Sequence, residues 1–427
     1  MAAAGDTIVA LSSGRPPAAI AVVRSSGPQA HVVAQRLTGA LPKPRNAVLR
    51  RLVDPRDGAL IDEALILRFD APNSATGENI VEYQCHGGRA TVDALIGAMT
   101  GMAGVRLAEP GEFTRRALAN GRIDLTEAEG LADLLTAETE LQRRSAMARA
   151  GGALRARLDD WRERLLALSA RTEVAIDYPD EEDGAGDPDL SADIALLASE
   201  MTELLGAPRV EPLREGIRVV VAGPPNVGKS SLVNALAQSD RAIVTPVAGT
   251  TRDVIEVPIA IGGVPFVLVD TAGLRETGDE VETIGIGRAR SEAERADLLL
   301  WLGPETDSPN HAGLVGLKAK ADVERNDGDT RLAVSALSGE GLQSLSALLV
   351  QRAKLLLPKG DELALDRRQH ELLGRASKAL ARGSGLSDPL FAAEELRSAR
   401  QSIDQIAGRA GVDDLLDALF GRFCLGK

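Results

Sequence analysis

The alternation of apolar and polar positions divides the chain into regions of different character. Residues 1–118 combine short β-branched runs, at 20–23 and 64–67, with glycine- and proline-rich turns and a helical stretch at 91–99. Strands this short between helices predict a compact α/β domain that ends near residue 118.

Helical periodicity dominates the next region, residues 119–212. Between positions 154 and 168, four leucines and a tryptophan recur at spacings of four and three, which places them on one stripe of a long helix. The acidic run at 179–189 is rich in turn residues and predicts a loop between two helices.

The pattern of apolar and polar residues changes again at residues 213–356. A β-branched run at 217–222 precedes a glycine-rich turn and a helix that opens at Lys229, and strands and helices then alternate. This alternation is typical of a mostly parallel sheet. Helical texture returns at 357–427, so we expect 119–212 and 357–427 to form one discontinuous helical domain around the inserted unit. The predicted fold class is multi-domain α/β plus α.

Charge and composition exclude several classes of protein. The 49 basic and 62 acidic residues give a net charge of −13, which argues against a histone-like nucleic-acid binder. Aromatic residues make up 2% of the chain, too few for a base-stacking platform. No run approaches the roughly 20 apolar residues of a membrane span, and the start shows no secretory signal. We therefore expect a cytoplasmic protein with no membrane association.

Two local patterns leave a choice between an ordinary and a functional reading. Residues 143–164 carry seven arginines against three acids, which predicts a solvated helix face, with an RNA-facing surface as the alternative. The sequence Cys85-His86-Gly87-Gly88 predicts an ordinary turn, because four histidines and two cysteines in all offer no metal-ligand spacing.

The strongest motif is the phosphate loop at 223–231, GPPNVGKSS. It follows the predicted strand at 217–222 and opens a helix, as a GxxxxGKS loop requires. Its backbone N–H groups and the helix N-terminus can hold a β-phosphate. Lys229 is expected to reach the β- and γ-phosphates, and Ser230 to ligate magnesium.

Further motifs follow in the order of a nucleotide switch. Asp270-Thr271-Ala272-Gly273 ends an apolar strand at 264–269 and matches the DxxG that senses the γ-phosphate and positions magnesium. Thr251 lies between the two motifs and can close on magnesium when a triphosphate is bound. Such switches order their loops on the γ-phosphate and release them on hydrolysis.

Catalysis needs two roles that the usual residues do not fill. Position 274 is leucine, where many small GTPases use a glutamine to orient the attacking water. A downstream acid can take that role, and three acids are near: Glu276, Glu280 and Glu282. Asn226 places a side-chain oxygen beside the phosphates, so a monovalent cation can supply the transition-state charge; the alternative is a simple turn residue.

Base recognition departs from the usual NKxD pattern. Ala319-Lys320-Ala321-Asp322 keeps the lysine that covers the base and the aspartate that selects guanine, but loses the asparagine. Ser335-Ala336-Leu337 suits the backbone contact to the guanine oxygen. We therefore expect GTP specificity with weakened affinity. About ten residues, 303–312, separate the strands at 298–301 and 314, so a crossover helix is expected to be truncated.

With these motifs assembled, the chain closely resembles the bacterial and organellar tRNA modification GTPase family, written MnmE or TrmE. The resemblance rests on segments along nearly the whole length. They include DTIVAL, TGENIVEYQCHGG, EPGEFTRRALANGRIDLTEAEGLADLL, PNVGKSSLVNAL, DTAGLRET, VETIGIGRA and the terminal FCLGK.

The resemblance implies an N-terminal folate-binding and dimerisation domain at 1–118. It also implies a helical domain in two parts, 119–212 and 357–427 with the C-terminal CLGK motif, around a P-loop GTPase (G) domain at 213–356. It implies a homodimer that works with a flavin-dependent partner, MnmG, on tRNA. The reaction adds an aminomethyl or carboxymethylaminomethyl group to C5 of the wobble uridine, with a carbon from 5-formyltetrahydrofolate or another tetrahydrofolate derivative.

The family's site residues carry over by position. Catalytic roles fall to Glu282, which would orient the water, with Lys229 and Thr251; magnesium falls to Ser230 and Thr251. Potassium is implied at Asn226, Thr245, Val247 and Thr250, and folate at Arg24, Glu82, Arg122 and Lys427. The predicted contacts to GTP or GDP are Asn226, Val227, Gly228, Lys229, Ser230, Ser231, Thr245, Pro246, Val247, Ala248, Gly249, Thr250, Thr251, Asp270, Thr271, Ala272, Gly273, Lys320, Asp322, Ser335 and Ala336.

Two other function classes stay open at this point. One is a regulatory RNA-binding GTPase that acts in ribosome or RNP maturation without modification chemistry, which a folate-binding test would separate. The other is a partner-dependent nucleotide binder that acts as a scaffold, motivated by Ala319 and the short crossover.

Overall fold

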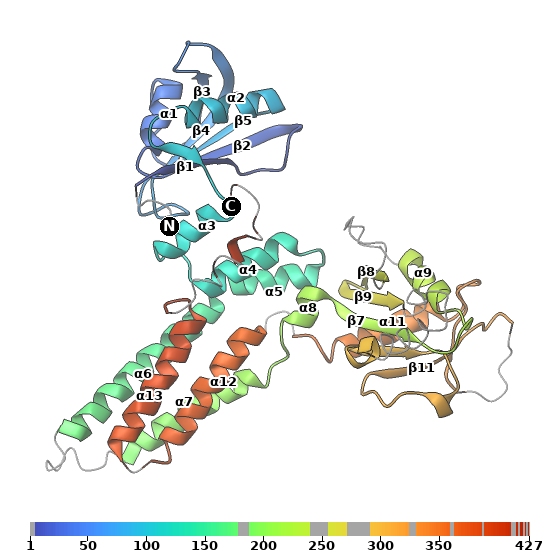
Figure 1. The fold of residues 1–427 in the computed structure, drawn as a ribbon. Helices are drawn as coiled ribbons and strands as arrows, with labels where there is room; N and C mark the ends of the chain where they lie inside the picture. The colour runs from blue at the N-terminus through green and yellow to red at the C-terminus, as the bar shows by residue number, and fades with distance from the viewer. Residues whose placement is uncertain are drawn as a thin grey trace, which may run out of the picture. The chain divides into compact units, whose positions relative to one another are not determined.

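A computed structural model describes most of the chain, in two compact units. The described residues are 5–177, 188–239, 255–270, 291–323, 330–358, 363–386, 388–410, 416, 419–421, 423 and 426. The first unit comprises Met1–Ala132, Arg155–Asp159 and Asp404–Lys427, and the second comprises Asp133–Leu154 and Asp160–Ile403. Each unit is described by itself (Figure 1).

The first unit contains a six-stranded sheet of order β3-β4-β5-β2-β1-β6. Its strands are β1 (Thr7–Leu11), β2 (Ala18–Ser26), β3 (Val48–Val53), β4 (Leu60–Phe69), β5 (Ile80–Gly87) and β6 (Val105–Leu107). All pairings are antiparallel except that of β1 with β6, which is parallel. The β-branched runs predicted at 20–23 and 64–67 are confirmed as parts of β2 and β4.

Two helices cover one face of this sheet. They are α1 (Ala30–Thr38) and α2 (Arg89–Thr100), which extends the helix predicted at 91–99. Apolar side chains of both helices, such as Leu37 and Leu95, share a core with Ile66 and Tyr83 of the strands. On the other face Ile20, Leu49 and Leu65 are exposed by 62%, 59% and 40%. That face therefore presents apolar side chains that no described element covers.

The end of the chain packs against the same unit. The Ser12 Oγ donates to the Gly426 carbonyl at 2.9 Å. A Cβ at Gly426 would lie 2.0 Å from the Leu11 carbonyl oxygen, and one at Gly111 would lie 2.7 Å from that of Phe420. The two glycines thus permit the tail to approach the domain more closely than any side chain would allow.

The remaining helices of the chain follow the predicted helical texture. They are α3 (Glu112–Ala119), α4 (Leu125–Thr136), α5 (Glu140–Ala150), α6 (Ala153–Asp177), α7 (Pro188–Leu205), α8 (Glu211–Glu215), α12 (Arg367–Gly383) and α13 (Pro389–Ile406). The leucine and tryptophan stripe of α6 is buried, with Trp161 at 0% exposure. The acidic run at 179–189 lies outside the described residues, apart from the backbone of its last two positions.

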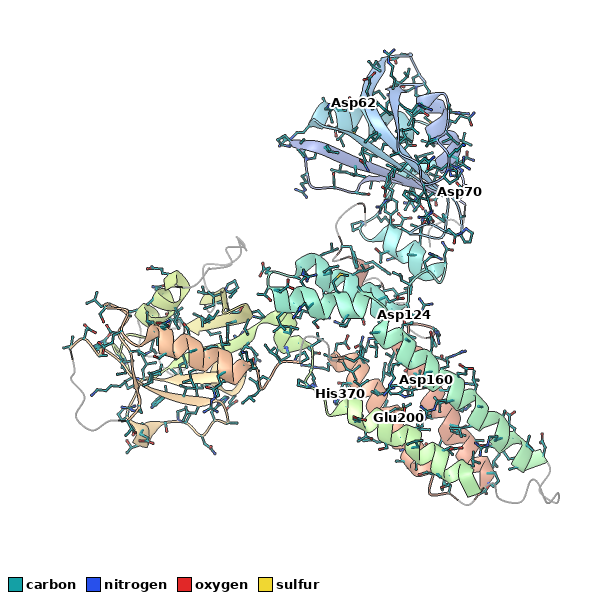
Figure 2. The ribbon with its side chains drawn as sticks, turned by 180° about the vertical axis from the view of Figure 1, so that it is seen from behind. Asp62, Asp70, Asp124, Asp160, Glu200 and His370 are labelled. Carbon is teal, nitrogen blue, oxygen red and sulfur yellow. The ribbon has the colours of Figure 1, made fainter. Side chains whose placement is uncertain are left out.

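The two helical stretches pack together, as predicted. The Thr202 hydroxyl of α7 lies 2.9 Å from the Ser377 hydroxyl of α12, and the His370 ring of α12 contacts the Leu205 carbonyl. Figure 2 shows Asp160 and Glu200 on adjacent helices, α6 and α7; Trp161 donates to that Glu200 at 3.1 Å. Residues far apart in the chain therefore share one bundle.

The second unit also holds a six-stranded sheet, of order β12-β11-β10-β7-β9-β8. Its strands are β7 (Ile217–Ala222), β8 (Ile255–Ile261), β9 (Val264–Asp270), β10 (Leu298–Trp301), β11 (Leu314–Lys318) and β12 (Leu332–Ala333). Only β8 runs antiparallel to its neighbour, so the prediction of a mostly parallel sheet is confirmed.

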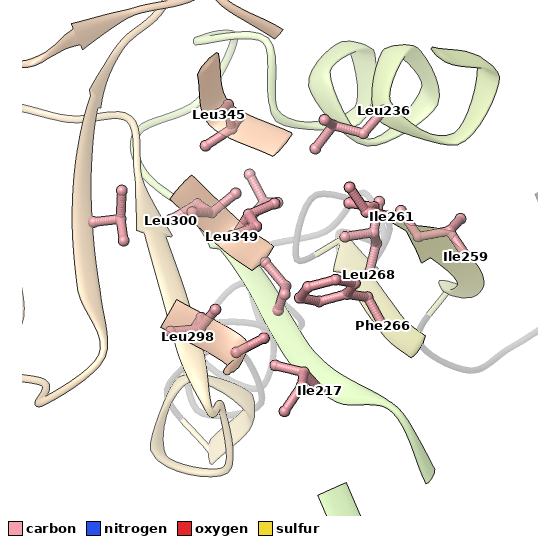
Figure 3. Close-up of a cluster of buried hydrophobic side chains, with 14 of the residues drawn as sticks. Ile217, Leu236, Ile259, Ile261, Phe266, Leu268, Leu298, Leu300, Leu345 and Leu349 are labelled. Atoms are coloured by element: carbon pink, nitrogen blue, oxygen red, sulfur yellow. The ribbon is translucent and has the colours of Figure 1, made fainter. Parts of the chain in front are cut away.

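Helices α9 (Lys229–Ser239) and α11 (Leu342–Ala353) pack on this sheet. Figure 3 shows Leu236 of α9 and Leu345 and Leu349 of α11 over apolar side chains such as Phe266 and Leu300. Between β10 and β11 the chain forms a single 3-10 turn, Glu305–Asp307, and no longer helix. The truncated crossover predicted from the sequence is therefore present.

A cluster of charges lies where the chain enters and leaves this sheet domain. The Asp133 carboxylate accepts from Arg149 of α5 and from Arg214 of α8, whose Nε lies 2.7 Å away. Arg149 is 2% exposed and also lies 3.9 Å from Asp366, which caps α12. The Val210 N–H donates to the Leu365 carbonyl, so the two connections are held side by side.

Several arginines of residues 143–164 form ion pairs with acidic residues of the same chain. Arg143 pairs with Glu140, Arg155 with Glu127, and Arg164 with Glu200. Arg149 is buried, so the prediction of a solvated face is wrong at that position. The pairing favours the structural interpretation of this stretch over an RNA-facing one.

Candidate functional site

The phosphate loop lies between β7 and α9, as the sequence predicted. The loop needs unusual backbone angles: φ is +146° at Gly223 and +102° at Gly228, which glycine adopts without strain. Asn226 also has a positive φ, +60°, and its side chain is exposed. α9 begins at Lys229, so the N-terminal N–H groups of this helix face the loop.

The lysine of the loop is held over its own backbone. Lys229 is 7% exposed, and its ammonium donates to the carbonyls of Gly223 and Pro224 at 3.0 and 2.8 Å. Ser230 and Ser231 are exposed in the first turn of α9. A buried cation, helix N–H groups and free hydroxyls at one loop fit a phosphate group and a magnesium ion.

Asp270 lies close to this loop because of the sheet topology. It ends β9 and is aligned with Val221 of β7, the strand that leads into the phosphate loop. The carboxylate is 4% exposed. The carboxyl ends of neighbouring parallel strands bring a DxxG aspartate and a phosphate loop to one edge, where open α/β sheets bind their ligands.

A cavity of about 500 Å³ adjoins the loop and contains the residues predicted to recognise a base. Val227, Gly228 and Ser231 come from the phosphate loop and α9, and the remaining wall follows β11 and β12. Its lining residues predicted from the sequence are Val227, Gly228, Ser231, Lys320, Asp322, Ser335 and Ala336. The tertiary structure therefore brings together two motifs that lie about a hundred residues apart in the sequence.

Within this cavity the aspartate that is predicted to select the base is held in place by hydrogen bonds. The Ser335 hydroxyl donates to Asp322 Oδ1 at 2.5 Å and accepts from the N–H groups of Leu337 and Ser338. Ser335 was predicted to contribute only a backbone contact, so its role in fixing Asp322 was missed. Lys320 adopts φ +57°, at the turn between the two lining strands.

One apolar residue of the cavity, Val323, was also missed, and Leu337 was predicted only for a backbone contact. Val323 and Leu337 line the cavity and are exposed by 74% and 89%. A flat purine base has apolar faces that such side chains can cover. No sequence signal singles out their side chains, because isolated exposed apolar residues are common on any protein surface.

Several predicted site residues fall outside the described residues. These are Thr245, Pro246, Val247, Ala248, Gly249, Thr250, Thr251, Thr271, Ala272, Gly273, Glu282 and Lys427. Leu274 and the alternative acids Glu276 and Glu280 lie outside them as well, as does Cys424. Their predicted roles therefore stay predictions.

A second polar group lies on the first sheet, at the predicted folate residues. Arg24 of β2 and Glu82 of β5 are paired in register, and the guanidinium binds Oε1 at 2.7 and 3.0 Å. The Arg24 guanidinium also lies 5.7 Å from the ring centre of Phe113, which is buried in α3. Phe113 was not predicted as part of this group.

The third described folate residue stands apart from that pair. Arg122 is exposed, and its side chain passes 3.2 Å from the position of a Cβ at Gly77, in the loop before β5. Among the described residues, no hydrogen bond or ion pair joins it to Arg24 or Glu82. Arg122 places a cation beside that loop.

The Cys85-His86 pair is part of strand β5, so the prediction of a turn there is wrong. Burial raises the pKa of Cys85, whose Sγ lies 3.6 Å from the Ala21 carbonyl oxygen. His86 Nδ1 lies 2.8 Å from an Asp62 carboxylate oxygen. Burial raises the pKa of the Asp62 carboxyl, but the hydrogen bonds from His86 outweigh it, so the pKa is lowered overall. No cluster of metal ligands occurs in the part of the chain that the structure describes.

The fold and the loop together define a P-loop GTPase domain joined to an N-terminal α/β domain and a helical bundle. Two family models match the chain: "GTP-binding protein TrmE N-terminus" over residues 7–122 and "MnmE helical domain" over residues 125–424. The second match extends across the inserted sheet domain.

Curated relatives match over the whole length. The tRNA modification GTPase MnmE of Erythrobacter litoralis is 53% identical over 99% of this chain and 100% of its own. That of Rhizorhabdus wittichii is 54% identical over 100% and 98%. The chain therefore belongs to the MnmE family of tRNA modification GTPases.

Comparison with solved structures adds no weight to this assignment. The G domain of the T. maritima FeoB iron transporter is 25% identical over 32% of this chain and 98% of its own, with a TM-score of 0.23. Among the described residues, no helix is both long and apolar enough to cross a membrane.

Proposed function

We propose that this protein is a potassium-dependent GTPase of tRNA wobble-uridine modification. GTP hydrolysis would be coupled to addition of an aminomethyl or carboxymethylaminomethyl group to C5 of the uridine, with a flavoprotein partner of the MnmG kind. The carbon would come from 5-formyltetrahydrofolate or another tetrahydrofolate derivative. The observation that carries the GTPase part is the shared cavity of the phosphate loop, Asp322 and Ser335.

The nucleotide roles follow from the chemistry of the loop. The Lys229 ammonium and the α9 N-terminus supply positive charge to the β- and γ-phosphates. Ser230 would hold magnesium together with Thr251, and the Asp270 carboxylate would act through water in the same site. Magnesium would supply charge neutralisation at the transferred phosphoryl group.

Potassium would fill the place of an arginine finger. The exposed side chain of Asn226 offers the oxygen that a monovalent cation requires, beside the phosphate loop. Thr245, Val247 and Thr250 would complete the cation site, and Glu282 would orient the attacking water that Leu274 cannot bind.

The folate part rests on a polar group on the sheet face that the helices do not cover. Arg24, held by Glu82 and stacked on Phe113, has the fixed fork geometry that binds a carboxylate or a pterin ring. Arg122 and Lys427 would add cations, and the docked tail would bring Cys424 near the one-carbon group.

The same domain would form the homodimer. Leu49 and Leu65, which are opposite each other, and Ile20, which is beside His86, leave exposed apolar area on one accessible sheet face, as homodimer interfaces do. We further propose the domain limits 1–118, 119–212, 213–356 and 357–427, and action on tRNA in the cytoplasm.

The first test compares GTP hydrolysis rates of the purified protein in potassium and in sodium at equal ionic strength. We expect a large potassium preference, and we expect Asn226→Ala to remove that preference while nucleotide binding persists. Equal rates in both salts for the parent protein would rule out the cation mechanism for the isolated chain.

A further inference from the structure

The acidic residues of this chain are absent from one long segment. From Thr7 to Val53 the sequence contains no aspartate or glutamate, although the whole chain has 62 acids in 427 residues. The segment carries seven cations: Arg15, Arg24, Arg36, Lys43, Arg45, Arg50 and Arg51. Removing these seven positive charges from the net −13 leaves −20 on the rest of the chain. This segment of the first unit therefore carries a net charge of +7.

Five of these cations lie along one border of the first sheet, with Arg50 and Arg51 on opposite faces of their strand. Arg36 is in the last turn of α1, Lys43 and Arg45 follow in the loop, and Arg50 and Arg51 belong to β3. β3 is the edge strand of the sheet and packs beside α1 (Figure 1). We call Arg36, Lys43, Arg45, Arg50 and Arg51 the basic edge.

Within the described part of the chain, the charges of the basic edge are not neutralised. Four of the five side chains are exposed and that of Arg50 is half-buried. Arg45 donates to the Asn73 carbonyl at 2.7 Å and Arg50 to the Leu49 carbonyl at 3.1 Å. These acceptors are uncharged, and no ion pair of the basic edge with an acid is found among the described residues.

The acids nearest to the basic edge have other partners or stand apart. Asp54 binds Arg56 at 2.6 Å, and Asp70, labelled in Figure 2, binds Arg68 at 2.7 Å and His31 at 3.3 Å. Glu63 is opposite Arg51 in the β3–β4 register, yet the two form no ion pair within the described chain. The arginines of residues 143–164 differ in this respect, because acids such as Glu140 and Glu200 hold them.

One member of the basic edge is kept in an unfavourable backbone conformation. Arg45 has φ +62°, where glycine or asparagine would cost less. Its guanidinium lies 5.6 Å from the ring centre of Phe69, and its N–H donates to the Arg68 carbonyl. The surroundings thus fix a cation at a turn that does not favour one, which is typical of binding sites.

We infer that the basic edge binds the phosphate backbone of tRNA. This inference rests on the proposed action on tRNA and adds the surface that contacts it. Unpaired arginine and lysine side chains on an acidic protein create a local attraction for a polyanion, through release of its counterions. Such contacts position an RNA without reading its sequence. Free base-stacking aromatics are not needed for this mode, and Phe69 is covered by Arg45.

The test measures binding of the full chain to a fluorescein-labelled tRNA transcript with uridine at the wobble position, over a series of salt concentrations. The variant is Lys43→Gln/Arg50→Gln/Arg51→Gln, which leaves the packed Arg45 intact. The matched control is Arg143→Gln/Arg382→Gln/Arg397→Gln, which removes three exposed arginines that are paired with Glu140, Glu395 and Glu394. Both variants lose three positive charges.

For the basic-edge variant we expect the slope of log affinity against log salt to fall by about 2, and Kd at low salt to rise roughly tenfold. The control should keep the slope of the parent, and all three proteins should hydrolyse GTP at the same rate. Equal slopes for the parent and the basic-edge variant would overturn this inference but not the proposed function. A loss of tRNA affinity in the control alone would have the same meaning. Absence of tRNA binding by the parent would overturn the proposed action of this chain on tRNA as well.

Discussion

At the scale of single residues, the base cavity depends on an aspartate that a hydroxyl holds in place. Asp322 accepts from Ser335, and the residue at 319 is alanine, which has no side-chain donor for a base. Discrimination of guanine would therefore depend on the Asp322 carboxylate more heavily than in a domain with the complete NKxD motif.

We predict that Asp322→Asn changes the preferred nucleotide from GTP to xanthosine triphosphate. The carboxylate accepts from two N–H groups of guanine, and loss of such charged hydrogen bonds costs about 3 kcal/mol, roughly a hundredfold in affinity. Titration with fluorescent GDP and XDP measures this. Unchanged GDP affinity would mean that Asp322 does not contact the base.

A buried carboxylate in the first unit gives a prediction about pH. Asp124 is 7% exposed and caps α4 by accepting from the Glu127 N–H, and its Oδ2 has no hydrogen-bond partner among the described residues. Burial raises the pKa of this carboxyl above 3.8. The folded state then holds a proton more tightly than the unfolded state, so stability is lost as pH rises through the raised pKa.

We expect Asp124→Asn to increase the melting temperature at pH 7. Asparagine is an equally good helix cap but carries no charge that burial would penalise. The gain should vanish below pH 3.8, where the parent carboxyl is protonated in both states. Thermal unfolding at several pH values measures it, and a variant less stable than the parent at pH 7 would show that the charge itself is needed.

At the scale of elements, α4, α5, α8 and the start of α12 are joined by shared charges. Arg149 and Arg214 converge on Asp133, and Arg214 is three residues before the start of β7, the strand that leads into the phosphate loop. In α5 the Gln142 amide also donates to the Leu213 carbonyl at 3.0 Å. Ion pairs and a hydrogen bond thus fix the segment that enters the sheet domain to the helical domain.

We predict that Asp133→Ala destabilises the protein by about 3 kcal/mol, because it leaves the buried Arg149 without its carboxylate. The double variant Asp133→Leu/Arg149→Met should recover part of that loss, since a buried ion pair can be replaced by apolar side chains. Melting temperatures of the three proteins report it. Glu394→Ala, which breaks an exposed pair, serves as the control and should change little.

At the scale of the whole molecule, the open face of the first sheet concerns assembly. Leu49 and Leu65 are directly opposite each other on β3 and β4, and both are exposed. On the helix-covered face, neighbouring positions such as Leu52 are completely buried. One face of this sheet is therefore covered by helices, whereas the other exposes apolar side chains to solvent in a single chain.

We expect Leu49→Glu/Leu65→Glu to convert the proposed homodimer into a monomer, because four like charges would be buried at the proposed interface. Light scattering coupled to size exclusion measures the mass. Leu390→Glu, at a leucine of α13 that is exposed by 62%, is the control and should leave the mass unchanged. A parent protein that is monomeric at micromolar concentration would contradict the proposed dimer.

Features of this protein that depend on interactions between residues close in the chain could be predicted from the sequence. The strand, loop and helix around Lys229 are local, because glycine positions, helix opening and apolar runs act over a few residues. The truncated connection after β10 was predictable for the same reason: ten residues cannot hold a full crossover helix. The motifs also predicted which residues would meet in the nucleotide cavity, since strand ends of a parallel sheet share one edge.

The ion pairs and hydrogen bonds between side chains far apart in the chain could not be predicted, because they depend on the tertiary structure. Arg164 pairs with Glu200, 36 residues away, and Arg149 is buried, and no local pattern predicts either outcome. The basic edge lies in a segment without acids, but only the structure shows that no acid of the described chain folds back to pair with it. Likewise Ser335 fixes Asp322, and Phe113 supports Arg24, across turns and strands. The physical reason is that charge pairing and burial are decided by what packing brings within a few ångströms, whereas composition and periodicity describe only what each segment carries.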